Sequence, residues 1–288
     1  MMVRTGRGPR RAEAHGGRSS ALDEPLATPH NHQMKTYSLA FAALLLGAAP
    51  APEPSWQRIF DGKTLDGWTP KITGRALGED PLEMFIVQDG AIRVSHAHYS
   101  KFSGEFGHLF WKRPLGAFRI RFEYRLFGES LPGIKPWQAT NSGLMFHAQP
   151  PETIRRDQDF PVSLEMQLLA TPRPTEEPSG NLCTPGTTVM FQGKRDPRHC
   201  ILSNAPLLAA GRWTKAELEV LPSGIITHFI DGKPVLRYSN VELDPQDEDA
   251  KPLVAAAGGR LALTRGYIAL QGEGHPIEFR NIDLQILD

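Results

Sequence analysis

The sequence predicts an all-β protein of the sandwich, barrel or jelly-roll type. Beyond Ser55 it consists of short runs in which apolar and polar residues alternate, separated by Gly, Pro, Asp and Asn. Asp89-Gly90 and Asp231-Gly232 each stand between two such runs, and this pair is typical of two-residue hairpin turns. No stretch after residue 50 has a convincing amphipathic helical pattern, and the 25 prolines disfavour long helices.

The expected strands follow this alternation along the chain. The clearest is Phe118–Leu126, in which every second residue is apolar and is expected to face inward. The other expected strands are Phe85–Val87, Ala91–Val94, Asn141–His147, Ser163–Leu168, Ile225–Ile230, Val235–Tyr238 and the closing segment from Tyr267 to Ile286. In that segment the apolar phase shifts, which predicts a β-bulge near Asn281.

Two segments lack a strand pattern. Pro150–Pro161 and Pro172–Asn204 are long and rich in proline, and they are expected to be loops. Loops of this length are more often functional or disordered than simple connectors.

The N-terminal 50 residues are expected to lie outside the folded domain. Residues 1–33 are Arg-, Gly- and Ser-rich without apolar periodicity, and they are expected to be a mis-assigned extension. Residues 34–50 have the pattern of a secretory signal peptide: Lys35, an apolar run from Leu39 to Ala49, and small residues at its end. The apolar run is too short to span a bilayer, so a secreted or periplasmic protein is expected, with its domain at residues 55–288.

The charge balance disfavours nucleic acid and anionic membranes as partners. Residues 1–50 hold 6 of the 32 Lys and Arg residues and 3 of the 32 Asp and Glu residues. The remainder carries 26 basic and 29 acidic groups, a net charge of −3, and therefore has no basic footprint.

The two cysteines, Cys183 and Cys200, are expected to form a disulfide, because an even pair in an oxidising compartment is most simply bonded. The alternative is a metal site that uses His199 and Cys200. A lone His-Cys pair lacks the usual spacing of zinc ligands, so this alternative is weaker.

Three expected strands place polar groups on one face, opposite an apolar face. Asn141 and His147 share one face, as do Glu165 and Gln167, and a third set comprises Gln271, Glu273 and His275. Solvated outer faces are the ordinary explanation of such polar rows. Together, however, the three strands can form one polar floor on a rigid sheet, bounded by the long loops.

Seven motifs in order resemble the 3-keto-disaccharide hydrolase family, and the match extends over about Ser55 to Asp288. They are Phe60–Trp68 (FDGKTLDGW), Gly107–Phe110 (GHLF), Phe122–Arg125 (FEYR), Asn141–Gly143 (NSG), Leu164–Gln167 (LEMQ), Asn181–Gly186 (NLCTPG) and Phe279–Ile282 (FRNI). The resemblance implies a concanavalin-like jelly roll of two antiparallel sheets. It also implies action on glycosides whose sugar is oxidised to a ketone at C3, by hydrolysis or by 1,2-elimination followed by hydration.

Such chemistry has defined requirements. A C3 ketone acidifies the C2 proton, so elimination needs a general base, a group that stabilises the enolate oxygen, and an acid for the leaving oxygen. Direct hydrolysis needs two carboxylates that flank the anomeric carbon. Glu165 and Glu273 can supply either pair, so the two routes stay open.

The candidate catalytic residues are Glu165, His147, Glu273 and Arg280, with Glu165 ranked first. His147 is a candidate base or metal ligand, and Arg280 is a candidate enolate stabiliser or an ion-pair partner of Glu278 or Glu123. The candidate substrate-binding residues are Asn141, Gln167, Gln271, His275, Trp137, His108 and Arg125. Of these, His108 and Arg125 match family positions and are expected to lie behind the residues that contact substrate.

Cofactor and alternative function remain open at this level. A divalent metal ion held by Asp157, Asp159 and His147 is a candidate, although nothing fixes their geometry. The alternative to an enzyme is a non-catalytic carbohydrate-binding module on the same scaffold. An enzyme is expected to bring Glu165, His147, Glu273 and Arg280 into one cleft, whereas a binding module is expected to show exposed aromatic platforms and scattered carboxylates.

Overall fold

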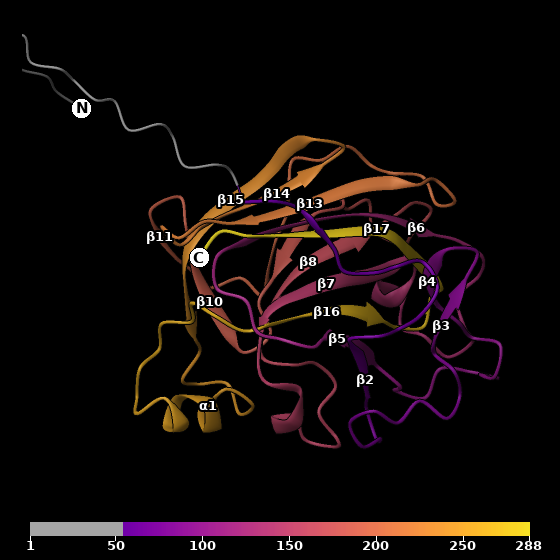
Figure 1. Cartoon of the computed structure of the whole chain (residues 1–288), viewed down its shortest axis with the longest axis horizontal. Helices are drawn as coiled ribbons and strands as arrows, with labels where there is room; N and C mark the ends of the chain where they lie inside the picture. Colours follow the sequence, from indigo (N-terminus) through magenta and orange to yellow (C-terminus); the bar gives the residue numbers. More distant parts are fainter. Residues whose placement is uncertain (1–53) are drawn as a thin grey trace, which may run out of the picture. The chain divides into compact units, whose positions relative to one another are not determined.

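The structure is a computed structural model that describes residues 54–288. The expected extension (residues 1–33) and signal peptide (residues 34–50) lie outside the described residues. Within the described part, 17 strands form two antiparallel sheets, one of ten strands and one of seven. The predicted all-β sandwich of two antiparallel sheets is therefore confirmed (Figure 1).

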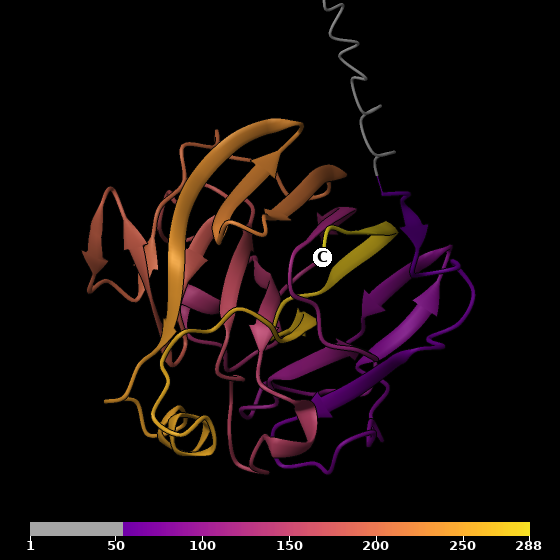
Figure 2. The same ribbon diagram turned by 60° about the vertical axis from the view of Figure 1, so that its left-hand side comes forward.

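The ten-stranded sheet has in spatial order β11 (Lys194–Asp196), β10 (Thr187–Phe191), β15 (Lys233–Leu243), β14 (Ile225–Ile230), β13 (Thr214–Val220), β6 (Phe118–Leu126), β17 (Ile277–Ile286), β4 (Ala91–Val94) and β3 (Phe85–Gln88), while β1 (Gln57–Arg58) pairs with β17 off this path. The long, curved β15 is the prominent orange strand of Figure 2.

The seven-stranded sheet has in spatial order β12 (Cys200–Ile201), β9 (Asn181–Cys183), β8 (Leu164–Leu169), β7 (Asn141–Ala148), β16 (Tyr267–Gly272), β5 (Gly107–Trp111) and β2 (Trp68–Ile72). Strands β5, β7, β8 and β16 lie below β6, β13, β14 and β17 in the view of Figure 1. The single α-helix of the described part, α1 (Lys251–Ala256), is short, as are the 3₁₀ turns η1 (Pro136–Gln138) and η2 (Pro151–Thr153).

The core forms where the apolar faces of the two sheets meet. In β6 the five alternate apolar residues from Phe118 to Leu126 are all buried, as predicted. From the other sheet, β7 contributes Leu144 and Phe146, and β8 contributes Leu164, Met166 and Leu168. Since strand side chains alternate in direction, the remaining residues of β7 and β8 must face away from this core.

Both predicted hairpins are confirmed. Asp89-Gly90 joins β3 to β4, and Asp231-Gly232 joins β14 to β15. All four turn residues have positive φ, as the type I′ turn requires. The predicted bulge is also present, because the pairing of β17 with β6 shifts register between Arg280 and Asp283, and Asn281 has a φ of 53°.

One expectation about the loops is wrong. The segment Pro172–Asn204 contains the four short strands β9, β10, β11 and β12. They lie at or beside the sheet edges, where two to five residues are enough to pair with a neighbour, so their alternation was too brief to detect. Of residues 54–288, none belongs to a helix long and apolar enough to cross a membrane.

Candidate active site

The site lies on the face of the seven-stranded sheet that points away from the core. Strand pairing places Met145 of β7 opposite Glu165 of β8, and Glu165 opposite Cys183 of β9. One row further along, Gly143 lies opposite Gln167, and on β16 Gln271 lies opposite His108 of β5. This face therefore carries a carboxylate, two amides and an imidazole on adjacent rigid strands.

A cavity of about 440 Å³ opens over this face, and we call it the acid cavity. Its lining residues come from β7, β8, β9, β12 and the surrounding loops. They are Trp137, Asn141, Phe160, Glu165, Gln167, Arg173, Glu177, Cys183, Pro185, His199, Cys200, Leu202 and Glu273. The volume falls within the range of small-molecule sites.

Glu165 is the first of two buried acids in the acid cavity. It is only 7% exposed, and no ion pair to it occurs among the described residues. Burial raises the pKa of its carboxyl group to about 8. Gly143 leaves the room for this side chain: a Cβ at position 143 would lie 2.7 Å from Cγ of Glu165. The absence of a side chain at Gly143 thus lets the carboxyl group extend across β7.

Glu273 is the second acid of the cavity. It follows the end of β16, is 1% exposed, and accepts a hydrogen bond from Nδ2 of Asn141 at 3.3 Å. Burial raises the pKa of Glu273 well above its usual value, and the Glu165 carboxylate raises it further. Asn141 and Arg173 oppose this rise without cancelling it.

The two acids therefore lose their protons in order. Glu165 titrates at about pH 8, and its negative charge then holds the proton more firmly on Glu273. Once Glu165 has lost its proton, Glu165 is therefore ionised while Glu273 is still protonated. This state provides one base and one acid within the same cavity.

Several buried polar atoms of this sheet face and of the acid cavity have no hydrogen-bond partner. They include Oδ1 of Asn141, both side-chain polar atoms of Gln271, Nε2 of His108 and Nη1 of Arg173. Buried polar atoms are normally hydrogen-bonded, because leaving one unpaired costs about 1–3 kcal/mol. Asn141 and Arg173 line the acid cavity, and hydroxyl and carbonyl groups of a bound sugar are suitable partners for their free polar atoms.

The other predicted binding residues lie at different depths. Trp137 stands at the rim of the acid cavity, 43% exposed, with its ring stacked parallel to that of Phe106. Gln167 lines the cavity and accepts a hydrogen bond from Asn181 at 3.0 Å. His108 lies on the same face but is fully buried beside Phe160, and burial lowers its pKa to about 3.

His147 is not part of the acid cavity, contrary to expectation. A register shift between Tyr267 and Ala269 places a bulge in β7, and His147 has a φ of 45°. The strict alternation that linked His147 to Asn141 is therefore broken. Its Nε2 lies 3.2 Å from the carbonyl oxygen of Gly116, in a separate hollow.

Arg280 and Arg125 are also absent from the acid cavity. Both belong to the ten-stranded sheet, on the outer face, because Phe279 and Tyr124 beside them point into the core. Arg280 pairs with Glu123 at 2.7 Å, and its guanidinium lies 3.8 Å from the ring centroid of Trp213. The final two strands thus enter different sheets, which their alternation could not show.

His275 lies close behind Glu273 but does not line the acid cavity. Its Nδ1 is 2.8 Å from Oγ of Ser130, and the side chain is 3% exposed. Burial and the neighbouring His96 lower the pKa of His275 to about 4. It is therefore neutral at physiological pH and placed to support the loop that carries Glu273.

Arg173 lines the acid cavity, although no pattern in the sequence predicts this. It lies in the proline-rich segment after β8, which had no recognisable pattern beyond its length. Its side chain is only 2% exposed. An arginine bounded by prolines in a long loop gave no signal that separated it from the other loop arginines.

The disulfide between Cys183 and Cys200 forms one wall of the acid cavity. The two cysteines are direct neighbours on β9 and β12, and Cys183 is also paired with Glu165. Both sulfur atoms are in the covalent bond, so the alternative metal site with His199 and Cys200 is wrong.

Replacing both cysteines with alanine is expected to lower the free energy of unfolding by about 3 kcal/mol, since the bond closes a loop of 17 residues. Urea denaturation of the two proteins measures this difference. A double variant as stable as the parent protein would contradict a structural role for the bond.

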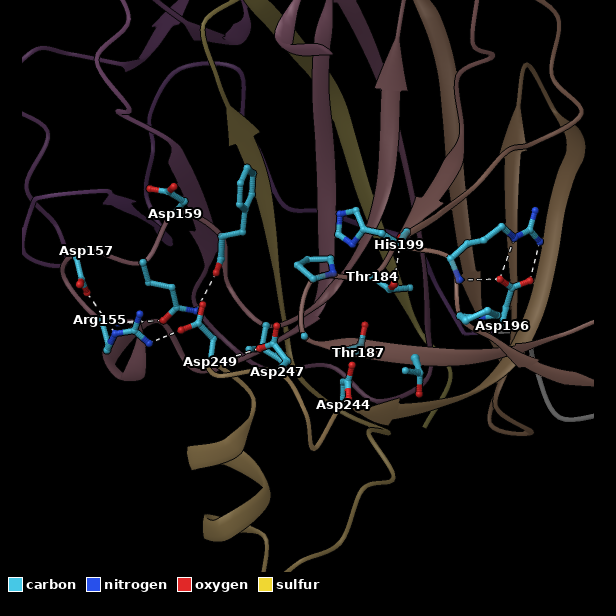
Figure 3. Close-up of a pocket in the computed structure, with 18 residues that line it drawn as sticks. Arg155, Asp157, Asp159, Thr184, Thr187, Asp196, His199, Asp244, Asp247 and Asp249 are labelled. Atoms are coloured by element: carbon cyan, nitrogen blue, oxygen red, sulfur yellow. Dashed lines mark hydrogen bonds and ion pairs between the residues drawn. The ribbon is translucent and has the colours of Figure 1, made fainter. Parts of the chain in front are cut away.

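A second hollow adjoins the acid cavity and shares Phe160, Pro185 and His199 with it. Figure 3 shows its aspartates: Asp157 and Asp249 both pair with Arg155, while Asp159 stands apart from them.

The proposed metal ligands are not together. His147 belongs to a different hollow from Asp157 and Asp159, so this ligand set is wrong. Among residues 54–288, no three His, Cys, Asp or Glu side chains are grouped so that they could hold a metal ion.

The raised pKa of Glu165 has a consequence for stability. Unfolded glutamate ionises near pH 4.5, whereas folded Glu165 stays protonated up to about pH 8. The folded state therefore holds the extra proton between these values, and the free energy of unfolding falls by a few kcal/mol as pH rises through this window. Glu165→Gln should lack this loss.

Urea denaturation of Glu165→Gln and the parent protein should show a stability advantage for the variant that grows between about pH 5 and about pH 8.5. An advantage that is identical at both pH values would contradict a raised pKa for Glu165.

Comparison with known proteins agrees with the resemblance seen in the sequence. Residues 55–285 match the model of the 3-keto-alpha-glucoside-1,2-lyase-like domain. A 3-keto-disaccharide hydrolase of Bacteroides thetaiotaomicron is 24% identical over 257 residues, which cover 83% of this chain and 81% of the relative.

The chain is also similar to two solved structures of low sequence identity. One is a Parabacteroides distasonis protein provisionally described as a glycosyl hydrolase, with 18% identity, coverage of 81% of this chain and 94% of that chain, and a TM-score of 0.47. The other is the carbohydrate-binding module CBM66 of Bacillus subtilis, with 9% identity, coverage of 76% and 95%, and a TM-score of 0.45.

Proposed function

Because the chain belongs to the family of 3-keto-alpha-glucoside-1,2-lyase-like domains, we propose that it cleaves glycosides whose sugar carries a ketone at C3. The observation that carries this proposal is the pair of buried acids, Glu165 and Glu273, in one cavity with raised pKa values. Perturbed acids in a cleft are characteristic of catalytic sites. The relative from Bacteroides thetaiotaomicron, a 3-keto-disaccharide hydrolase, supports the same substrate class.

In the proposed reaction Glu165 acts as the base. Its carboxylate takes the C2 proton, and the C2–H electrons form the enolate of the C3 ketone. A glutamate with a pKa of about 8 is a far stronger base than an ordinary one, and about one tenth of it is ionised at pH 7.

Glu273 then acts as the acid. The enolate collapses, the C1–C2 double bond forms and the C1–O bond breaks, while Glu273 gives its proton to the leaving oxygen. Water adds across the double bond in a later step: its hydroxyl group joins C1 and its proton passes to Glu273, while C2 takes a proton from Glu165 after that carboxyl group has exchanged with solvent. The net result is hydrolysis of the glycoside, reached through elimination.

The rim of the acid cavity suits a sugar ring. Trp137 and Leu202 are among the few large apolar side chains that are exposed in residues 54–288, and both line the cavity. The apolar face of a sugar can lie against Trp137 while its hydroxyl groups reach Asn141 and Gln167. The disulfide beside Glu165 supports action outside the cytoplasm, where such bonds persist.

The exposed Trp137 also favours a second candidate function, a carbohydrate-binding module without activity. The two functions separate when purified protein is incubated with 3-keto-glycosides and with the matching 3-hydroxy glycosides, with and without a chelator. Cleavage of the 3-keto substrates alone supports the enzyme. Binding of either sugar without any cleavage would favour the binding module.

A further inference from the structure

Arg173 is a buried cation inside the acid cavity. Its side chain is 2% exposed, and burial lowers its pKa. Arginine is rarely buried unless the charge is paired, because desolvation of a cation is costly. The partners of the guanidinium therefore decide which part of it the loop holds and which part is free to bind a ligand.

Only part of the guanidinium is held by the protein. Nη2 pairs with Glu177 at 3.0 Å and lies 3.4 Å from the carbonyl oxygen of Trp137, while Nε donates to Thr175 at 3.3 Å. Nη1 has no hydrogen-bond partner. The loop thus fixes one edge of the group, while a donor on the other remains available.

Glu273 does not accept a hydrogen bond from this free Nη1. Its carboxyl group is close enough for the charge of Arg173 to oppose the rise of its pKa, yet the two groups do not form an ion pair within 4.0 Å. Arg173 is also the only lysine or arginine among the lining residues of the acid cavity. Negative charge that develops inside the cavity has this one permanent cation to stabilise it.

We propose that Arg173 binds the C3 oxygen of the substrate through Nη1 and stabilises it as it becomes an enolate oxygen. This inference rests on the proposed function, which requires such a group opposite the base. The charge on C3 oxygen rises as Glu165 removes the C2 proton, and a donor already fixed in place stabilises that charge without reorganisation. Arg173 thereby takes the role that the sequence suggested for Arg280.

The test compares Arg173→Gln and Arg173→Lys with Arg198→Gln as the matched control. Arg198 lies in the same segment of the chain and pairs with Asp196 outside the acid cavity. Arg173→Gln should lower kcat by about 10²–10³-fold. Arg173→Lys should retain an intermediate rate, and Arg198→Gln should match the parent protein.

A second measurement separates catalysis from support of the loop. Added guanidinium ion should restore part of the activity of Arg173→Gln, and the rate of C2 proton exchange with D₂O should fall in parallel with kcat. If Arg173→Gln keeps kcat within threefold of the parent value, or loses activity only through KM, the role of Arg173 is overturned while the proposed function stands. If the parent protein cleaves no 3-keto-glycoside, both are overturned.

Discussion

Glu165→Gln is expected to lower kcat by about 10²–10⁴-fold on every 3-keto-glycoside, whatever its leaving group. Glutamine keeps the shape of the side chain over Gly143 but cannot accept the C2 proton. The loss should be the same for alkyl and aryl glycosides, because proton abstraction precedes departure of the leaving group. Steady-state kinetics on a matched pair of substrates measures this.

The control for this variant is Glu217→Gln. Glu217 lies on β13 in the other sheet and pairs with Arg119 at 3.1 Å, outside the acid cavity. Its replacement should leave kcat unchanged.

In the parent protein kcat/KM should rise with pH, reach half of its maximum near pH 8 and level off above that value, since only ionised Glu165 is active. If Glu165→Gln keeps the parent activity, the assignment of the base is wrong.

Glu273→Gln is expected to divide substrates by their leaving group. Alkyl and sugar leaving groups need a proton as the C1–O bond breaks, so kcat on these substrates should fall by about 10²–10⁴-fold. A nitrophenolate leaves without protonation, so the kcat of Glu273→Gln on a nitrophenyl 3-keto-glucoside should fall much less. Parallel assays of the two substrates give the ratio directly.

A loss that does not depend on the leaving group would refute this assignment. If Glu273→Gln loses equal activity on both substrates, Glu273 does not act as the acid. Asn141→Ala provides a related comparison, because Asn141 donates a hydrogen bond to Glu273. The fall in kcat of Asn141→Ala should be smaller than that of Glu273→Gln and should depend on the leaving group in the same way.

The sequence predicted the fold well, because the patterns that indicate strands and turns involve only residues close together in the chain. Alternation in Phe118–Leu126 and the two Asp-Gly turns depend only on neighbouring residues, and the structure confirms them. The bulge at Asn281 was visible for the same reason, since it shifts the apolar phase within one strand.

The site was predicted only in part, because it depends on which strands are neighbours. Glu165, Glu273 and Asn141 lie in one cavity, as predicted from their positions on the polar faces of their strands. His147 does not, because a bulge broke the alternation by which it was placed. Arg280 does not, because β16 and β17 enter different sheets although a few residues separate them.

Arg173 was beyond reach of the sequence for a different reason. It lies in a loop, and its position depends on tertiary contacts with Trp137 and Glu177 rather than on any periodicity. Only the three-dimensional structure shows that its Nη1 has no hydrogen-bond partner.

The most direct test of the central claim is cleavage of a 3-keto-glycoside in D₂O, followed by proton NMR of the released 3-keto-sugar. If Glu165 removes the C2 proton before the C1–O bond breaks, the product should carry solvent deuterium at C2, above the exchange seen without protein or with Glu165→Gln. Cleavage that leaves the original C2 proton in place would contradict this account and indicate direct hydrolysis between the two acids.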